Sequence, residues 1–317
     1  MTPQALWLVG LPFGAATLVF ILRRFWIGAL IAALIALFLA WLAITLPTGI
    51  VFNLLGRTVE LDQFSQFAIF LLFVTTALLV ITQIFLTTFY SRKSRTIATD
   101  THQAGRVFYP AALVILGVFV AASLSRHLGI TAILIEVAAI IMVFVIQTER
   151  LESTRASLRF LVLASLATPL FLLAAWQVDD VQLTDRVIST QIAEQVALLI
   201  GGGFAIWLAI VPFHSWLTST AAEALPLTAA FVLIAFPVVA IVTFAHVLSD
   251  WPWLTNTSFL IRGIILAGLF TTLVGGSLAG IQRGFDELLG YAALFNLACT
   301  VSMLGVGGDE AIITVIF

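Results

Sequence analysis

Long apolar runs recur along almost the whole chain, and short polar segments separate them. Because a helix needs about 20 mostly apolar residues to cross a bilayer, each run predicts one membrane span. The expected spans lie near residues 5–22, 26–46, 65–88, 108–124, 129–147, 158–176, 193–222, 226–248, 259–281, 286–305 and 310 onward. The pattern therefore predicts an all-α, polytopic transmembrane helix bundle of about 10–11 spans.

The run at 193–222 is unusual because polar and helix-breaking residues interrupt it. Three consecutive glycines, Gly201, Gly202 and Gly203, precede Pro212 and the polar His214. Proline removes a backbone donor, and a freed carbonyl is tolerated in hydrocarbon only where protein or a water-filled cavity covers it. We therefore predict a broken helix, with carbonyls that lack helical partners between Gly201 and Pro212. Interrupted helices of this kind often lie at transport sites.

Composition supports a membrane protein and narrows its chemistry. The chain has 317 residues, of which 62% are hydrophobic and 9% charged, whereas soluble domains are about a quarter charged. A net charge of -2 on so few ionisable groups argues against a nucleic acid partner. The single cysteine, Cys299, lies in an apolar run and predicts neither a disulfide nor a metal site. We expect no catalytic residue, metal or cofactor, since neither a nucleophile–base arrangement nor a phosphate-binding loop is visible.

Basic residues are distributed unevenly between the two sets of loops. If the N-terminus lies outside, the inner loops hold Arg23, Arg24, Arg92, Lys93, Arg95, Arg106, Arg150, Arg155 and Arg283. The outer loops hold only Arg57, Arg126, Arg186 and Arg262. This positive-inside bias predicts an outside N-terminus in a bacterial inner (plasma) membrane or an equivalent energy-transducing membrane. The cluster Ser91–Arg95 then serves as a topology signal or as a lipid headgroup contact.

Several short motifs add a more specific signal. Val211–Leu217 reads VPFHSWL and precedes AEALP at 222–226, while residues 61–67 read LDQFSQF. Further motifs lie at 130–137, 157–167 and 279–293. From about residue 61 to 307 the chain resembles the antiporter-like membrane subunits of respiratory complex I, the N, M and L type of NADH:quinone oxidoreductase. Mrp-type cation/proton antiporters and membrane-bound hydrogenases contain homologous subunits.

The resemblance implies a particular organisation of the spans. The family has two five-helix units of inverted topology, and this chain would contain one complete unit and the start of another. We expect spans 1–3 in residues 1–107, the complete unit (spans 4–8) in 108–248, and an incomplete second unit (spans 9–11) in 249–317. The expected partners are lipid and other membrane subunits of a multi-subunit complex, with a separate chain as one source of the missing C-terminal helices.

Four titratable residues are candidates for a proton path. Glu136 falls on the family's glutamate, and an intramembrane acid is a functional hypothesis by default. Arg159 is its nearest candidate partner, so we expect a buried Glu136 that pairs with Arg159 or with a water chain and that either functions or only fixes two helices. His214 and His246 are the other candidates, since their ordinary pKa is near neutral. His214 could instead cap freed backbone groups, and His246 could simply lie at the membrane edge.

Lysine is nearly absent, which weakens the expectation of proton transfer. Burial lowers the pKa of a lysine enough for it to release a proton, whereas arginine effectively cannot. The resembled family couples its glutamate to lysines in the sixth, seventh and eighth helices. Here those positions hold Arg159, Trp207 and roughly Phe236, and the only lysine is Lys93 in a loop. We therefore expect a degenerate or scaffold-type proton path.

Two functions remain open at this stage. In the first, the chain is a membrane-arm subunit of a redox-driven, proton-translocating complex that resembles NADH:quinone oxidoreductase and has no catalytic centre of its own. In the second, it is a subunit of a Mrp-type cation/proton antiporter or of a membrane-bound hydrogenase. The loss of lysine fits a scaffold role in the first class more easily, because an antiporter needs exchangeable charge within the membrane.

Overall fold

The computed structural model describes residues 4–22, 27–54, 57–90, 95–147, 153–183, 189–254 and 258–316 of the chain. Part of the basis for the predicted orientation lies outside these ranges, namely Arg23, Arg24, Arg92, Lys93, Arg150 and Arg186. The described helices are α1 (Gln4–Leu22), α2 (Ile27–Thr45), α3 (Gln63–Tyr90), α4 (Arg95–Leu124), α5 (Leu128–Gln147), α6 (Thr154–Leu183), α7 (Thr190–Trp207), α8 (Ser215–Glu223), α9 (Pro226–Asp250), α10 (Ser258–Ala279) and α11 (Phe285–Ile316).

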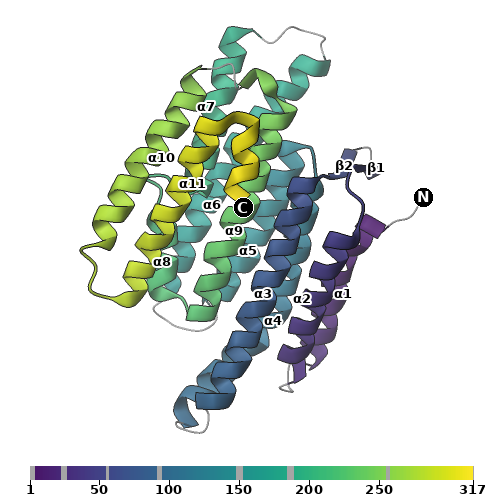
Figure 1. The fold of residues 1–317 in the computed structure, drawn as a ribbon, viewed down its shortest axis with the longest axis vertical. Helices are drawn as coiled ribbons and strands as arrows, with labels where there is room; N and C mark the ends of the chain where they lie inside the picture. The colour runs from purple at the N-terminus through teal and green to yellow at the C-terminus, as the bar shows by residue number, and fades with distance from the viewer. Residues whose placement is uncertain are drawn as a thin grey trace.

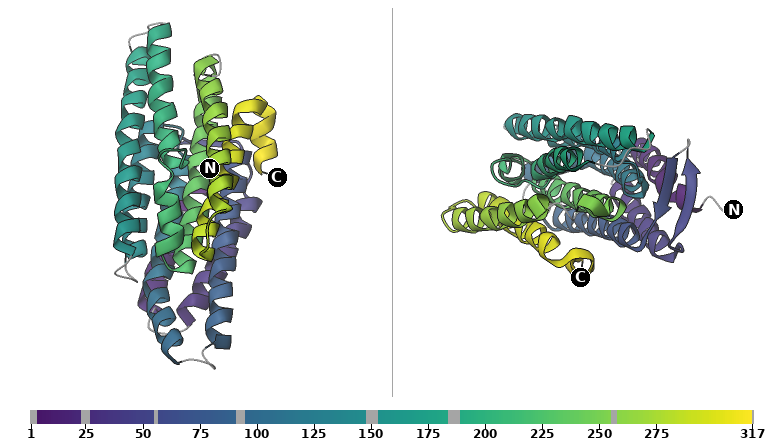
Figure 2. Two further views of the ribbon diagram at one scale, coloured as in Figure 1. Left: turned by 90° about the vertical axis from the view of Figure 1, so that its left-hand side faces the viewer. Right: turned by 90° about the horizontal axis from the view of Figure 1, so that it is seen from above.

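The helices form one elongated bundle, with α1 and α2 at one edge and α10 at the opposite edge (Figures 1 and 2). Helix α9 is central, because it packs against α3, α4, α5, α7 and α8 and also contacts α11. Eight of the described helices are long and apolar enough to cross a membrane, and α1 contains a shorter apolar stretch, Trp7–Leu22. The predicted all-helical membrane bundle is confirmed.

Three details differ from the sequence-based expectation. The predicted spans 286–305 and 310 onward belong to one helix, α11, which bends back near its C-terminal end in Figure 1. Helix α4 begins at Arg95, so the expected boundary at 107/108 falls inside a helix. A short hairpin, β1 (Ile50–Leu54) and β2 (Arg57–Leu61), fills the loop before α3, with Ile50 opposite Leu61. The hairpin lies against the turn between α4 and α5, because Val59 of β2 bridges to Ser125.

The interruption of the seventh span lies later than the glycines suggest. Helix α7 continues through Gly201, Gly202 and Gly203 to Trp207, so the prediction that the break begins at these glycines is wrong. Glycine costs about 1 kcal/mol relative to alanine in a helix interior, but close packing explains its presence here. A Cβ on Gly203 would lie 2.6 Å from the ring of Phe171 on α6. The missing side chain therefore lets α7 approach α6.

The break itself occupies Leu208 to His214 and includes Pro212. Its backbone turns at Ala209, whose φ of 54° lies in the left-handed region. The carbonyl of Ile206, which lies just before the break, accepts hydrogen bonds from the Ala209 N–H at 3.2 Å and from the indole of Trp216 at 3.0 Å. The N–H of Val211 donates to Thr271 Oγ1 on α10 at 3.0 Å. Protein side chains therefore supply partners for backbone groups that a continuous helix would have paired.

The close approach at Gly203 generates a first prediction. Gly203→Ala should lower the free energy of unfolding by about 1–3 kcal/mol, because overpacking against the Phe171 ring outweighs the gain in helix propensity. Thermal unfolding of the purified protein in detergent measures the change. Gly202→Ala is the matched control, since its Cβ would meet Leu170 at an ordinary 3.5 Å. Equal effects of the two substitutions would contradict the packing role of Gly203.

Candidate functional site

Glu136 lies near the middle of α5 and is half-buried rather than fully buried. Two hydroxyl groups on α6 hold its carboxylate: Ser165 Oγ donates to Oε1 at 2.5 Å, and Thr168 Oγ1 donates to Oε2 at 2.9 Å. Ser165 and Thr168 are three residues apart and therefore share one face of α6. This neutral clamp joins α5 to α6 without a positive charge.

The predicted pairing of Glu136 with Arg159 is wrong. Arg159 lies six residues before Ser165, which is about 9 Å along the helix axis, so its side chain starts well away from the carboxylate. It is exposed, and its Nη1 donates to Ser219 Oγ on α8 at 2.6 Å. Within the described ranges no ion pair joins Glu136 to Arg159. Arg159 instead helps to attach α8 to the start of α6.

Glu223 reinforces that attachment, a role that sequence reasoning missed. Its Oε2 accepts a hydrogen bond from the backbone N–H of Ala156 at 2.8 Å. Ala156 lies in the first turn of α6, where free N–H groups and the helix dipole favour a carboxylate. The motif AEALP contained the signal, since Glu223 ends α8 just before the turn into α9.

Aromatic side chains fill the centre of the bundle at the positions where the resembled family has lysines. The ring of Trp207 lies 4.2 Å from that of Phe171 and 6.2 Å from that of Phe236 (centroid distances). Phe236 also packs on Phe160 at 5.1 Å and on Trp216 at 5.4 Å. All five side chains are almost completely buried. This aromatic cluster, Phe160, Phe171, Trp207, Trp216 and Phe236, is packed and carries no titratable group.

His214 lies at the end of the interruption, apart from Glu136 and from the aromatic cluster. It occupies the position before α8 but makes no side-chain hydrogen bond that caps this helix. Its ring is half-buried and faces Tyr291 of α11 at 6.5 Å between centroids. Its Nδ1 is buried without a hydrogen-bond partner in the described part of the chain.

His246 belongs to a separate polar network at the end of the bundle that carries the hairpin. It is only 6% exposed, and its Nε2 lies 3.0 Å from Ser65 Oγ and 3.5 Å from Asp62 Oδ2. Ser65 Oγ donates its single proton to the carbonyl of Ser123 at 2.9 Å. It must therefore accept from His246, so Nε2 carries a hydrogen. His246 is thus held by contacts with Ser65 and Asp62, and it is not an isolated residue at a membrane edge.

Arg126 is the positive centre of this network. Its guanidinium lies 3.2 Å from Glu60, 3.6 Å from Asp62 and 3.4 Å from Asp250. Burial raises the pKa of Asp62, but the hydrogen bond and charge of His246 and the hydrogen bonds of Ser65 outweigh it, so the pKa lies well below its usual range. We call Glu60, Asp62, Arg126, His246 and Asp250 the hairpin-end cluster. Sequence reasoning found only His246, although Asp62 and Ser65 at three-residue spacing indicate the N-terminus of α3, where Ser65 N–H donates to Asp62.

The four predicted proton-path residues therefore do not form one connected site. Glu136 lies against α6, Arg159 contacts Ser219 in the middle of α8, His214 precedes α8, and His246 lies in the hairpin-end cluster. The aromatic cluster fills the interior near α6, α7 and α9. Chemically, the described residues offer the Glu136 clamp, the hairpin-end cluster and smaller polar contacts such as Arg159–Ser219 and His127–Asp179, together with a packed apolar centre.

Two curated proteins are similar in sequence over part of their length. NADH-quinone oxidoreductase subunit N of Rhodospirillum rubrum is 26% identical over 185 residues, which cover 55% of this chain and 38% of that protein. Formate hydrogenlyase subunit 3 of Escherichia coli is 26% identical over 204 residues, covering 61% of this chain and 32% of that protein. The chain thus matches well under half the length of either relative. No protein-family model matches the chain.

Solved structures agree with the fold along nearly the whole chain. Respiratory complex I from Thermus thermophilus with bound aureothin contains a chain that superposes with a TM-score of 0.72 at 17% identity, covering 98% of this chain and 67% of that one. The membrane-bound sulfane sulfur reductase, an archaeal respiratory membrane complex, gives 0.74 at 15% identity, covering 99% and 67%. These comparisons confirm the predicted resemblance to antiporter-like membrane subunits and the helical fold.

The low pKa of Asp62 generates a second prediction. Asp62→Asn should lower the free energy of unfolding at neutral pH by about 1–3 kcal/mol, since it removes charge-assisted hydrogen bonds in the hairpin-end cluster. A carboxyl whose native pKa is depressed stabilises the fold above its unfolded pKa of about 3.9 and loses that contribution as the pH falls further. The difference between the two proteins should therefore hold from pH 7 to about 5 and shrink below pH 4.

Unfolding midpoints measured across this pH range in detergent provide the test. Glu194→Gln is the control, because Glu194 is exposed on α7 and makes no ion pair in the described part of the chain. Its effect should stay within about 0.5 kcal/mol. An Asp62→Asn effect that is equally small at pH 7 would show that the cluster contributes little to stability.

Proposed function

We propose that the chain is a membrane-arm subunit of a redox-driven, proton-translocating complex that resembles NADH:quinone oxidoreductase. The observation that carries this proposal is the agreement of fold over 98% of the chain with a subunit of respiratory complex I. The sequence relatives support it, because both are named as subunits of redox enzymes. The chain itself would contribute no catalytic centre and would act through its neighbours.

Within such a complex the chain would serve mainly as a scaffold with a degenerate proton path. A proton relay needs groups that gain and lose protons within hydrogen-bond reach of one another or of bridging water. Trp207 and Phe236 stand where lysines would be needed, and both belong to the buried aromatic cluster. Glu136 is held by hydroxyl groups and the hairpin-end cluster lies apart from it, which supports a structural role for each.

A membrane-bound hydrogenase is the second candidate, because one relative is a formate hydrogenlyase subunit. A Mrp-type antiporter is a third, but ion exchange without a redox partner would depend more heavily on charges in the bundle centre. The packed aromatic cluster disfavours that function. Residues 108–248 would form the complete five-helix unit in each case, with 249–317 as the start of the second.

Asn296 supports the proposal that other membrane subunits cover this chain. It lies in the middle of the apolar stretch Phe285–Gly305 of α11, and it is exposed. Its side chain makes no hydrogen bond within the described ranges, and an unpaired amide in hydrocarbon costs several kcal/mol. A helix of another membrane subunit would provide the partner. We also propose an inner-membrane location with the N-terminus outside, as the distribution of basic residues suggests.

Purification of the intact complex from its native membrane tests the functional class. Mass spectrometry should identify redox subunits, including quinone-reducing or hydrogenase components, at a fixed ratio to this chain. Hydrogenase components without quinone-reducing ones would favour the second candidate. Only small antiporter subunits, with no redox protein, would overturn the proposal.

Glu136 generates a third prediction, which separates a scaffold from a working relay. Glu136→Gln should weaken assembly, because an amide offers one acceptor oxygen to the two hydroxyl donors, Ser165 and Thr168. Proton translocation per electron in the complex that still assembles should stay within about twofold of the original, since no connected relay would be lost. Native gel electrophoresis and proton uptake into membrane vesicles provide the two readouts.

Thr168→Val is the matched control for assembly, because it removes one of the same two hydrogen bonds and keeps the carboxylate. Both substitutions should weaken assembly to a similar extent. Full assembly of Glu136→Gln with intact electron transfer and collapsed proton translocation would show that Glu136 is a working relay residue.

A further inference from the structure

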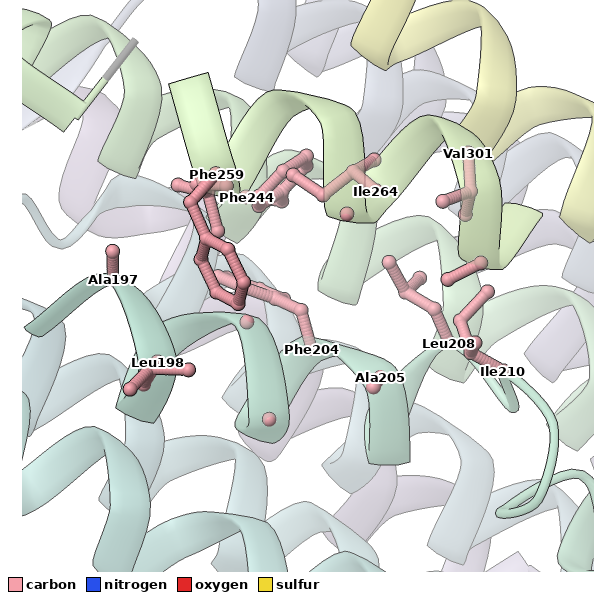
Figure 3. A pocket seen from close by; sticks show the side chains of 15 residues that line it. Ala197, Leu198, Phe204, Ala205, Leu208, Ile210, Phe244, Phe259, Ile264 and Val301 are labelled. Carbon is pink, nitrogen blue, oxygen red and sulfur yellow. The ribbon is translucent and has the colours of Figure 1, made fainter. Parts of the chain in front are cut away.

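An apolar groove opens on the side of the bundle between α7 and α10. It has a volume of about 180 Å³, and all fifteen residues that line it are Ala, Gly, Val, Leu, Ile or Phe. Figure 3 shows Phe204 of α7 and Leu208 of the break facing Phe259 and Ile264 of α10 across it. Such a lining offers no partner for water or ions, which require polar groups.

The rim of the groove faces the surroundings of the bundle. Leu198 on α7 is 56% exposed and Phe259 on α10 is 63% exposed. Both helices are apolar at this level, and α10 contains a membrane-spanning stretch, Phe259–Ala279. In a bilayer the groove would therefore open to lipid tails rather than to water.

Missing side chains create the groove. A Cβ on Gly263 would have no atom within 4 Å, whereas one on Gly201 would meet Leu260 at 3.3 Å. From Phe259 to Ala267 the groove follows α10 over nine residues, or about 12 Å. An extended hydrocarbon chain matches this apolar lining and length.

A positive charge lies on α10, one helical turn after Phe259 at the rim of the groove. Arg262 is exposed in the second turn of α10, and within the described ranges it makes no ion pair. Trp251 and Trp253 stack at 6.1 Å in the segment just before α10, and tryptophan is enriched at the level of lipid headgroups. A long arginine side chain near a helix end can reach that level and bind a phosphate.

We infer that this groove is a specific binding site for a membrane phospholipid, with one acyl chain between α7 and α10 and the phosphate at Arg262. The site lies next to the helix interruption, because Leu208 and Ile210 line the groove and belong to the break. The bound chain would complete the packing around the break from the lipid side. This role is separate from the proposed function, and its test does not depend on activity.

Photolabelling of the full chain tests the site. The protein, with any subunits that co-purify, is reconstituted in vesicles of phosphatidylethanolamine and phosphatidylglycerol that contain phosphatidylglycerol with a diazirine in mid-chain. Labelling should concentrate on the peptide that contains Phe204–Ile210. Gly263→Leu should reduce it about tenfold, because the new side chain occupies the space of the acyl chain. Gly14→Leu is the matched control, since a Cβ on Gly14 of α1 also meets no atom within 4 Å.

Arg262→Gln tests the headgroup separately. It should lower labelling by the phospholipid probe about fivefold and leave labelling by a diazirine fatty alcohol unchanged. Labelling spread over all exposed helices in proportion to their exposure would overturn the site. Equal labelling of Gly263→Leu and the unmodified protein would also overturn it. So would the finding that another part of the complex covers the groove and that no probe labels it. Equal loss of both probes in Arg262→Gln would overturn the assignment of the phosphate to Arg262.

Discussion

Every backbone polar group inside hydrocarbon needs a partner within the protein, and this constraint shapes the most irregular part of the chain. Pro212 and the turn at Ala209 prevent a continuous hydrogen-bond ladder through the seventh span. The indole of Trp216 and the hydroxyl of Thr271 replace part of that ladder. The break is therefore stable only because two other segments lie against it, so its geometry depends on the tertiary structure.

The same constraint governs the charged residues. The hairpin-end cluster gathers three carboxylates around one arginine and one histidine at one end of the bundle, where burial is incomplete. Glu136, deeper in the span, is held by hydroxyl groups that lower the cost of its desolvation. The bundle centre contains aromatic rings in edge-to-face and tilted contacts, and these rings carry no charge.

The sequence predicted the helices well because apolar runs of span length have few other solutions in a membrane. Pro212 correctly predicted that the helix breaks, but the glycines misplaced the start of the break. A glycine can mark either a flexible backbone or a close helix contact. At Gly203 the ring of Phe171 shows that the reason is close contact. The expected pairing of Glu136 with Arg159 rested on Arg159 being the nearest candidate along the chain, at the start of the next predicted span. Ser165 and Thr168 bind Glu136 instead. Hydroxyl residues are common in apolar helices, so their presence in the sequence did not indicate a partner for Glu136. The hairpin-end cluster joins residues from β2, α3, α4–α5 and α9, so only the folded chain reveals it.

The hydrogen bond from Val211 to Thr271 also has a consequence for biosynthesis. The acceptor lies 60 residues after the donor, on a helix that leaves the ribosome after α8 and α9 have been made. During insertion the Val211 N–H must therefore donate to water or to another acceptor until α10 enters the membrane. The break would then reach its final hydrogen bonding only after α10 has been translated and inserted.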